Sequence, residues 1–285
     1  MDGILYATVS RNFSQSTGSW FDFTYNAKPF YDQPPLAFWI QSSLFNLFGD
    51  SIYVERSYSF FCGLLAAFFL ILLWRKIHST NELAQFSWIP VFFFCSVPLI
   101  FWSYSSNMLE NTLSLFALSS VYFQLLCVEK KYSFFLLMPS SCSIFFAFLS
   151  KGLVGLFPLA FFLLHWLIFR SVKFSKMIAM SFLLLVITGI GFSMFFSFVP
   201  GSKEYFKMQF SAQVVSSLSG EVNLSLRPLL VPRRLFQELL PAIIFSLIFW
   251  LIAYRMGYYS WLSHKQAFPQ ALLFLLVARP INCDI

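Results

Sequence analysis

Long apolar runs recur along the chain and are separated by mostly short polar connectors. The seven longer runs cover residues 57–74, 86–103, 111–128, 133–150, 153–169, 177–199 and 239–254, and a shorter one covers 267–279. A helix that crosses a bilayer needs about 20 mainly apolar residues. The pattern therefore predicts about seven or eight spanning helices.

Two polar segments, 1–55 and 200–238, are much longer than the other connectors. Within the first, a Pro-Pro pair opens the apolar stretch 36–48, and Gly49 closes it. Proline at the start of a helix and glycine just past its end are the usual asymmetry. Because this amphipathic stretch is too short to span, we expect a helix that lies along the membrane surface.

The pattern divides the chain into four parts: an external segment 1–55 with its interfacial helix, six spans within 56–199, a second external segment 200–238, and one or two further, truncated spans within 239–285. Hydrophobic residues make up 58% of the chain, charged residues 11%, and the mean hydropathy is +0.72. Soluble proteins carry about 25% charged residues. We therefore expect an all-α integral membrane protein, a polytopic helical bundle.

Basic residues gather in alternate connectors. One set of connectors contains only two acids, Glu82 and Glu129, and holds the bases Arg75, Lys76, Lys130, Lys131, Arg170, Lys173, Lys176, Arg255 and Lys265. Cytoplasmic connectors are enriched in Lys and Arg, so this set is predicted to be cytoplasmic. The segments 1–55 and 200–238 then face outward. The net charge of +7 reflects this asymmetry, and no basic stripe predicts a nucleic-acid partner.

Short motifs follow one another in a recognisable order. They are DGILYA (2–7), GSW (18–20), YDQPPLAFW (31–39), FG (48–49), ERS (55–57), MLEN (108–111), FLSKG (148–152), YF through Gln209 (205–209), SLSGE (217–221) and ELLP (238–241). This order resembles the polyprenyl-phosphate-sugar-dependent membrane glycosyltransferases. That family includes the lipid A aminoarabinose transferases and the protein O-mannosyltransferases, which share the GT-C fold.

The resemblance implies an inverting hexosyl or pentosyl transferase. It would move a sugar from a polyprenyl-phosphate donor to a lipid A, glycan or protein acceptor, on the outer face of the cytoplasmic (inner) membrane. Such a donor carries its own leaving group, so the enzyme must place an acceptor beside a base and neutralise the departing phosphate. No cofactor is expected, with a divalent cation left open. The histidines, His78, His165 and His264, are too dispersed to predict a metal site.

The resemblance places two acids at the catalytic site, Asp2 and Glu110. The alternative for Asp2 is a terminal residue in solvent. The alternative for Glu110 is a helix cap, because Asn107 and Glu110 have the spacing of a capping box.

Two basic residues are candidates for binding the donor phosphate, Lys151 and Arg56. Lys151 is the only charge between two apolar runs, and its alternative is a snorkelling lysine at a turn with Gly152. Arg56 follows Glu55, so a local ion pair is its favoured alternative.

The remaining phosphate-binding candidates are Gln33, Lys28, Arg233 and Arg234. Many aminoarabinose-transferase relatives carry lysine before the Pro-Pro pair, where this chain has Gln33, which donates hydrogen bonds without charge. Lys28 is near enough in sequence to substitute for it. The Arg233-Arg234 pair is interpreted first as a headgroup anchor and second as a phosphate site.

Two interpretations other than a glycosyltransferase stay open. Transporters and flippases place ionisable groups near the bilayer midplane, whereas the apolar runs here are nearly free of charge. The third reading is an inactive truncated product. Relatives carry a transmembrane helix before the first-loop acid and more spans after the second long segment, so we expect this chain to be a fragment.

Overall fold

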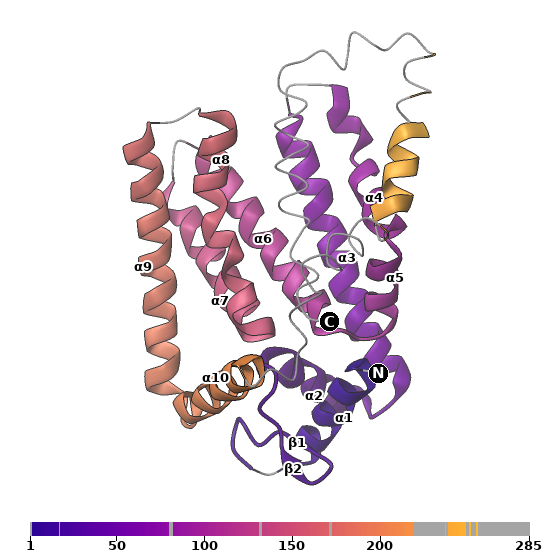
Figure 1. The fold of residues 1–285 in the computed structure, drawn as a ribbon, viewed down its shortest axis with the longest axis vertical. Coiled ribbons are helices and arrows are strands. Elements are labelled where there is room, and N and C mark those ends of the chain that lie inside the picture. The colour runs from indigo at the N-terminus through magenta and orange to yellow at the C-terminus, as the bar shows by residue number, and fades with distance from the viewer. Residues whose placement is uncertain are drawn as a thin grey trace.

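The computed structural model describes residues 2–16, 18–79, 82–130, 133–170 and 173–218, together with 237, 239–248, 251 and 255. Within these residues the fold is almost entirely helical. Long helices run side by side, and α1, α2, a small β-hairpin and α10 gather at one end of them (Figure 1). We call this the α1/α10 end of the bundle. The predicted all-α polytopic fold class is confirmed.

Residues 1–55, which are predicted to face outward and are called the first external segment throughout, form four elements: α1 (Asp2–Gln15), β1 (Thr24–Tyr25), β2 (Lys28–Pro29) and α2 (Leu36–Phe48). The strands are antiparallel, with Tyr25 opposite Lys28. Helix α2 has the bounds of the expected interfacial helix. Helix α1 was not expected, because its mixed composition produces no apolar run. It packs on α2, and the hydroxyl of its buried Ser10 bonds Gln41 of that helix.

The bundle and the segment after it hold further elements. They are α3 (Ile52–Ile77), η1 (Glu82–Phe86), α4 (Ile89–Ser96), α5 (Pro98–Ser105), α6 (Leu109–Glu129), η2 (Phe134–Leu136), α7 (Leu137–Lys151), η3 (Gly152–Ala160), α8 (Phe161–Phe169), α9 (Phe174–Phe198) and α10 (Ser202–Leu218). A short apolar helix, Leu239–Ile248, follows later in the chain. Helix α10 lies in the second external segment, where the apolar pattern predicted no element.

Among the described residues, four helical stretches are long and apolar enough to cross a membrane: Ile52–Ile77, Leu109–Glu129, Phe134–Phe169 and Phe174–Phe198. A fifth candidate is the pair Leu83–Ser96 and Pro98–Ser105, bent by 78°. The predicted count of seven or eight spans stays a prediction. The run 239–254 is described only in part, and 267–279 lies outside the described residues.

The stretch Phe134–Phe169 turns back on itself at Gly152, which has a φ of +65°. A Cβ atom on Gly155 would lie 2.3 Å from the backbone carbonyl of Ala147. Residues eight apart in one continuous helix are separated by about 12 Å, so this contact requires a hairpin. Helix α7 and the η3–α8 segment therefore pack antiparallel, as the separate runs 133–150 and 153–169 led us to expect.

The described residues form two large apolar cores and a third, small cluster of Tyr58, Cys62 and Leu115. The largest core lies inside the bundle, between α3, α6, α7, α8 and α9, and the second joins the first external segment to the ends of α6, α7, α9 and α10. Serine hydroxyls bridge α6 and α7 within the bundle, with Ser119 to Ser143 at 2.9 Å and Ser120 to Ser140 at 3.0 Å. Small polar residues allow spanning helices to approach closely.

Candidate functional site

An ion pair between Glu110 and Lys151 lies at the α1/α10 end of the bundle. Glu110 stands in the first turn of α6, and Lys151 is the last residue of α7. The Lys151 Nζ atom is 2.5 Å from Glu110 Oε1, and the lysine and glutamate side chains are 10% and 16% exposed. The structure thus brings together two of the predicted site residues from adjacent helices.

This contact corrects the capping-box alternative for Glu110. The N-cap residue of α6 is Met108, and it makes no side-chain cap hydrogen bond. Asn107 has a φ of +55° and donates instead to Gln41 Oε1 at 3.3 Å. The carboxylate of Glu110 therefore reaches toward α7 and does not cap its own helix.

Three segments that are distant in sequence meet at the turn after Lys151. The Tyr205 hydroxyl on α10 donates to the Gln33 carbonyl at 2.6 Å. A Cβ atom at Gly152 would lie 3.8 Å from Pro34 Cγ and 4.0 Å from Gln209 Nε2. Burial, together with the nearby charge of Asp32, raises the pKa of Tyr205, so its hydroxyl stays protonated and keeps donating. The predicted Gln33 segment is thus held beside Lys151.

Asp2 is the first residue of α1 and is exposed. The start of α1 packs closely against the turn that leads into α6. A Cβ atom on Gly3 would lie 1.6 Å from the Ser106 carbonyl oxygen. Only glycine permits so close an approach. The segment that carries Asp2 therefore lies beside the segment that leads to Glu110.

A buried amide ties α1, α2 and that turn together. The Oε1 atom of Gln41 accepts hydrogen bonds from Ser10 Oγ at 3.0 Å and from Asn107 Nδ2 at 3.3 Å. Gln41 is 2% exposed. The sequence marked Gln41 only as a polar position on an amphipathic helix, and nothing in the pattern linked it to Ser10 or Asn107.

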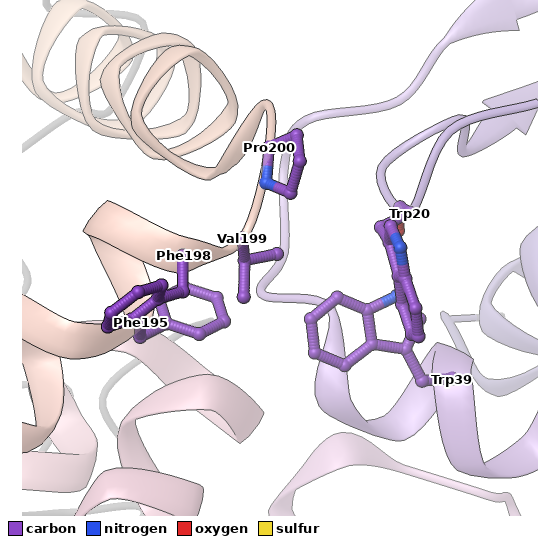
Figure 2. A pocket seen from close by; sticks show the side chains of 6 residues that line it. All are labelled: Trp20, Trp39, Phe195, Phe198, Val199 and Pro200. Atoms are coloured by element: carbon purple, nitrogen blue, oxygen red, sulfur yellow. The ribbon is translucent and has the colours of Figure 1, made fainter.

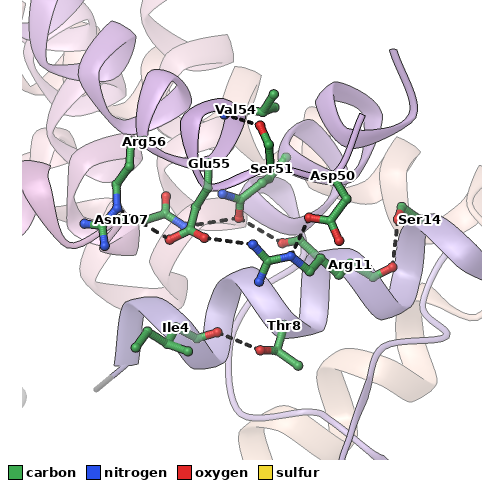
Figure 3. A network of polar contacts seen from close by, with 12 residues as sticks. Ile4, Thr8, Arg11, Ser14, Asp50, Ser51, Val54, Glu55, Arg56 and Asn107 are labelled. Atoms are coloured by element: carbon green, nitrogen blue, oxygen red, sulfur yellow. Dashed lines mark hydrogen bonds and ion pairs between the residues drawn. The ribbon is translucent and has the colours of Figure 1, made fainter. Parts of the chain in front are cut away.

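Arg11 forms the centre of a second polar network (Figure 3). Its Nε atom is 2.6 Å from Asp50 Oδ1, and its Nη2 atom is 3.2 Å from Glu55 Oε2. Arg56 contributes a longer contact, 3.9 Å from its Nε to Glu55 Oε1. Burial lowers the pKa of Arg11, but its interactions with Asp50 and Glu55 raise that pKa by a larger amount. The net shift is therefore upward.

This network changes the interpretation of two residues. Arg56 does pair with Glu55, as its favoured alternative held, but the shorter and more direct partner of Glu55 is Arg11. Arg11 was missed by the sequence analysis. Its one available signal was its place as a base in an acid-rich external segment.

The other predicted phosphate ligands lie apart from the ion pair or outside the described residues. Lys28 belongs to the exposed strand β2. Arg233 and Arg234 are outside the described residues. Among the described residues, no group of three or more His, Cys, Asp and Glu side chains is placed to hold a metal ion.

An apolar hollow of about 220 Å³ lies where the end of α9 meets the first external segment (Figure 2). The Trp39 Nε1 atom donates to the Trp20 carbonyl at 2.7 Å, and the two indoles lie edge to face. The lining residues carry no charge, and they are Trp20, Trp39, Phe195, Phe198, Val199 and Pro200. Such a lining suits a hydrocarbon chain and not a sugar phosphate.

These features define a polytopic helical membrane protein whose charged and polar side chains meet at one end of the bundle. The family model for dolichyl-phosphate-mannose-protein mannosyltransferases matches residues 32–196, and the chain belongs to this family. The resemblance noted from the sequence is thereby confirmed. No curated protein matches the chain.

Two solved structures share the fold. The crystal structure of ArnT from Cupriavidus metallidurans bound to undecaprenyl phosphate matches with a TM-score of 0.64 at 20% identity, over 99% of this chain and 51% of that one. The apo structure of the same protein matches with a TM-score of 0.58 at 19% identity, over 98% and 53%. The chain therefore spans about half the length of the structures it matches.

Proposed function

We propose that this chain is part of a membrane glycosyltransferase that moves a sugar from a polyprenyl-phosphate donor to an acceptor at the membrane surface. The observation that carries the proposal is the Glu110–Lys151 pair, largely enclosed at the end of an apolar bundle. The name of the matching family model includes dolichyl-phosphate-mannose, which is a sugar linked to a lipid phosphate. This supports the same class of donor. So does the undecaprenyl phosphate bound to a structural neighbour.

Lys151 is the proposed ligand of the donor phosphate. Its side chain is 10% exposed, so an arriving phosphate would meet the amine in a medium of low dielectric constant, where attraction between opposite charges is strong. Glu110 holds the amine in place before the donor arrives. A lysine with no such partner would be costly to bury.

Asp2 is the proposed group that orients or deprotonates the acceptor. Its support is the contact of its neighbour Gly3 with the Ser106 turn, which leads directly into the first turn of α6 and Glu110. Glu110 would assist by binding polar groups of the acceptor. A base beside a correctly placed acceptor hydroxyl accelerates transfer typically by about 10²–10⁴-fold.

The other predicted ligands have lesser proposed roles. Gln33 is held beside Lys151 through its carbonyl, which leaves its amide as a neutral donor toward phosphate. Arg56 is proposed to serve the Arg11 network first. Lys28, Arg233 and Arg234 are proposed to attract anionic lipid headgroups, as basic residues near a membrane surface do.

We place the reaction on the outer face of the cytoplasmic membrane, with lipid A, a glycan or a protein as acceptor. The described parts of the basic connectors after α3, α6 and α8 lie at the end of the bundle opposite the proposed site, which supports this orientation. The aromatic hollow beside the end of α9 suits the hydrocarbon chain of a lipid-linked substrate.

A transfer assay tests the donor class. Membranes containing the chain are supplied with undecaprenyl-phosphate-linked mannose or aminoarabinose, or with the corresponding nucleotide sugars after removal of lipid carriers. We expect transfer only from the lipid-linked sugars. Transfer from a nucleotide sugar without a lipid carrier would overturn the proposal, and flux of an unmodified solute without transfer would favour the transporter reading.

A further inference from the structure

Gln209 is a buried glutamine whose side-chain oxygen is unused. It lies on α10 and is 3% exposed, and its Oε1 atom has no hydrogen-bond partner among the described residues. Buried amide oxygens are nearly always paired, because an unpaired one loses its bonds to water without replacement. An unpaired buried acceptor beside a proposed substrate site calls for an explanation.

The side chain of Gln209 faces the turn that follows Lys151. Its Nε2 atom lies 4.0 Å from the position that a Cβ atom would take on Gly152, and Pro34 Cγ lies 3.8 Å from the same position. Gly152 leaves that position empty. The amide of Gln209 thus lies beside the turn next to the residue that we propose as the phosphate ligand.

The chemistry of the unused atom indicates which part of the donor it would bind. Oε1 is an acceptor and needs a partner that carries a proton. The phosphate of a polyprenyl-phosphate sugar is a diester, which has no proton to donate at neutral pH. A sugar hydroxyl has one, and it can also accept a bond from Nε2.

We propose that Gln209 recognises a hydroxyl group of the donor sugar, one step beyond the phosphate held by Lys151. This inference rests on the proposed function and makes Gln209 a specificity residue of the same site. A site that is built to bond a substrate hydroxyl discriminates strongly against an analogue that lacks it, because the buried partner is then left unpaired.

Gln124 is a matched control within the same chain. It is also fully buried, and its Oε1 atom also lacks a partner among the described residues. Its Nε2 atom, however, donates to Ser120 Oγ at 3.0 Å and to the Pro158 carbonyl at 3.1 Å, between α6 and η3. Gln124 thus reproduces the burial and the unused oxygen of Gln209 at a place inside the bundle.

The test measures binding of two probes to the purified chain in nanodiscs: undecaprenyl phosphate, and undecaprenyl phosphate carrying mannose or aminoarabinose. We expect the wild-type chain to bind one sugar-linked probe more tightly than the bare lipid phosphate. Gln209→Met should reduce that preference by about tenfold, a loss of about 1.4 kcal/mol. It should leave affinity for the bare lipid phosphate unchanged, and Gln124→Met should keep the preference.

A second measurement begins with the wild-type chain, so it does not depend on a variant that must fold. Donor analogues lacking one sugar hydroxyl at a time are bound to the wild-type chain, and one of them should lose the preference. That analogue and the parent donor should bind Gln209→Met equally.

Two outcomes would overturn the inference and leave the proposed function standing: a wild-type chain that prefers no sugar over the bare lipid phosphate, or a Gln209→Met chain that keeps its preference. Failure of the chain to bind either probe would refute the proposed function itself, and the inference with it.

Discussion

Among the described residues, Arg11 links α1 to the start of α3 through ion pairs. It bonds Asp50 and Glu55 at once, and its guanidinium lies 5.3 Å from the Phe45 ring centroid. Arg11→Ala would leave the Glu55 carboxylate, whose side chain is 6% exposed, without its closest partner. We expect a loss of about 1–3 kcal/mol in the free energy of unfolding, measured by denaturant titration in micelles.

Arg56→Ala is the control for that change. Its contact with Glu55 is 3.9 Å long and its side chain is 43% exposed, so we expect a loss below about 1 kcal/mol. Adding Glu55→Gln to Arg11→Ala should recover part of the stability, because the stranded charge is removed. Equal losses of stability in Arg11→Ala and Arg56→Ala would contradict the role of Arg11 as the main partner of Glu55.

Lys151 has a counterpart at the opposite end of the bundle that makes its role testable. Lys76 pairs with Glu129 at 2.5 Å, the same distance as in the Lys151–Glu110 pair. Lys151→Ala should raise the Michaelis constant for the lipid-phosphate donor, because donor binding is lost. Lys76→Ala removes an equivalent but more exposed ion pair and should leave that constant unchanged. Steady-state kinetics with both variants would decide, and a shared effect would point to general loss of folding.

Single residues were predictable where a motif or a lone charge marked them. Glu110 and Lys151 belong to the ordered motifs, and the structure pairs them. Gln209 was marked only as the end of one short motif, and Arg11 and Gln41 gave no comparable signal. Their partners lie far away in sequence, as the separation of Arg11 from Glu55 illustrates, and a polar residue in a polar segment is unremarkable until the chain is folded.

The α7–η3 hairpin depends on one glycine. A Cβ atom on Gly155 would lie 2.3 Å from both the carbonyl carbon and oxygen of Ala147. These are backbone atoms that cannot move aside cheaply, so Gly155→Ala should destabilise the protein by at least about 1–3 kcal/mol. Thermal unfolding followed by circular dichroism would measure the change.

Gly189→Ala on α9 is the matched control for the hairpin. A Cβ atom there meets nothing within 4 Å. Because alanine favours a helix over glycine by about 1 kcal/mol, this variant should be as stable as the wild type or more so. A Gly155→Ala chain that unfolds at the wild-type temperature would argue against the close packing of α7 on η3.

Elements were predictable where a long apolar run or a pair of end signals marked them. The bounds of α2 were predicted correctly because proline and glycine mark its ends, and its place at the membrane surface stays a prediction. Helices α1 and α10 were missed because each mixes polar and apolar residues and contains no long apolar run. The break between α4 and α5 was missed for another reason. Pro98 forces Val97 into an extended conformation, and a long apolar run conceals such a bend.

At the scale of the whole molecule, the alternation of basic connectors predicts which end of the bundle faces the cytoplasm. In a background without native cysteines, Ser211→Cys on α10 and Lys130→Cys after α6 place exposed thiols at opposite ends. A membrane-impermeant maleimide should label Ser211→Cys in intact cells and Lys130→Cys only after permeabilisation. The reverse pattern would place the proposed site on the cytoplasmic side.

The sequence predicted only in part that the proposed site residues would lie close together. Alternation of spans predicts the first external segment, the start of α6, the turn after α7 and the start of the second external segment at one end. Figure 1 shows α1, α2, the start of α6, the end of α7 and α10 together at that end. The contacts that join them, such as Tyr205 to the Gln33 carbonyl, depend on tertiary packing across most of the chain. No local pattern contains that information.

We propose above that sugar transfer takes place at the α1/α10 end, with Asp2 acting on the acceptor. The most direct test of this proposal is the turnover number of Asp2→Asn with a saturating polyprenyl-phosphate sugar, beside Asp22→Asn, an exposed carboxylate of the same segment that bonds Ser16 at 3.1 Å. We predict that Asp2→Asn loses about 10²–10⁴-fold in turnover while donor binding is retained, and that Asp22→Asn keeps the parent rate. An Asp2→Asn chain that turns over at the parent rate would contradict the account.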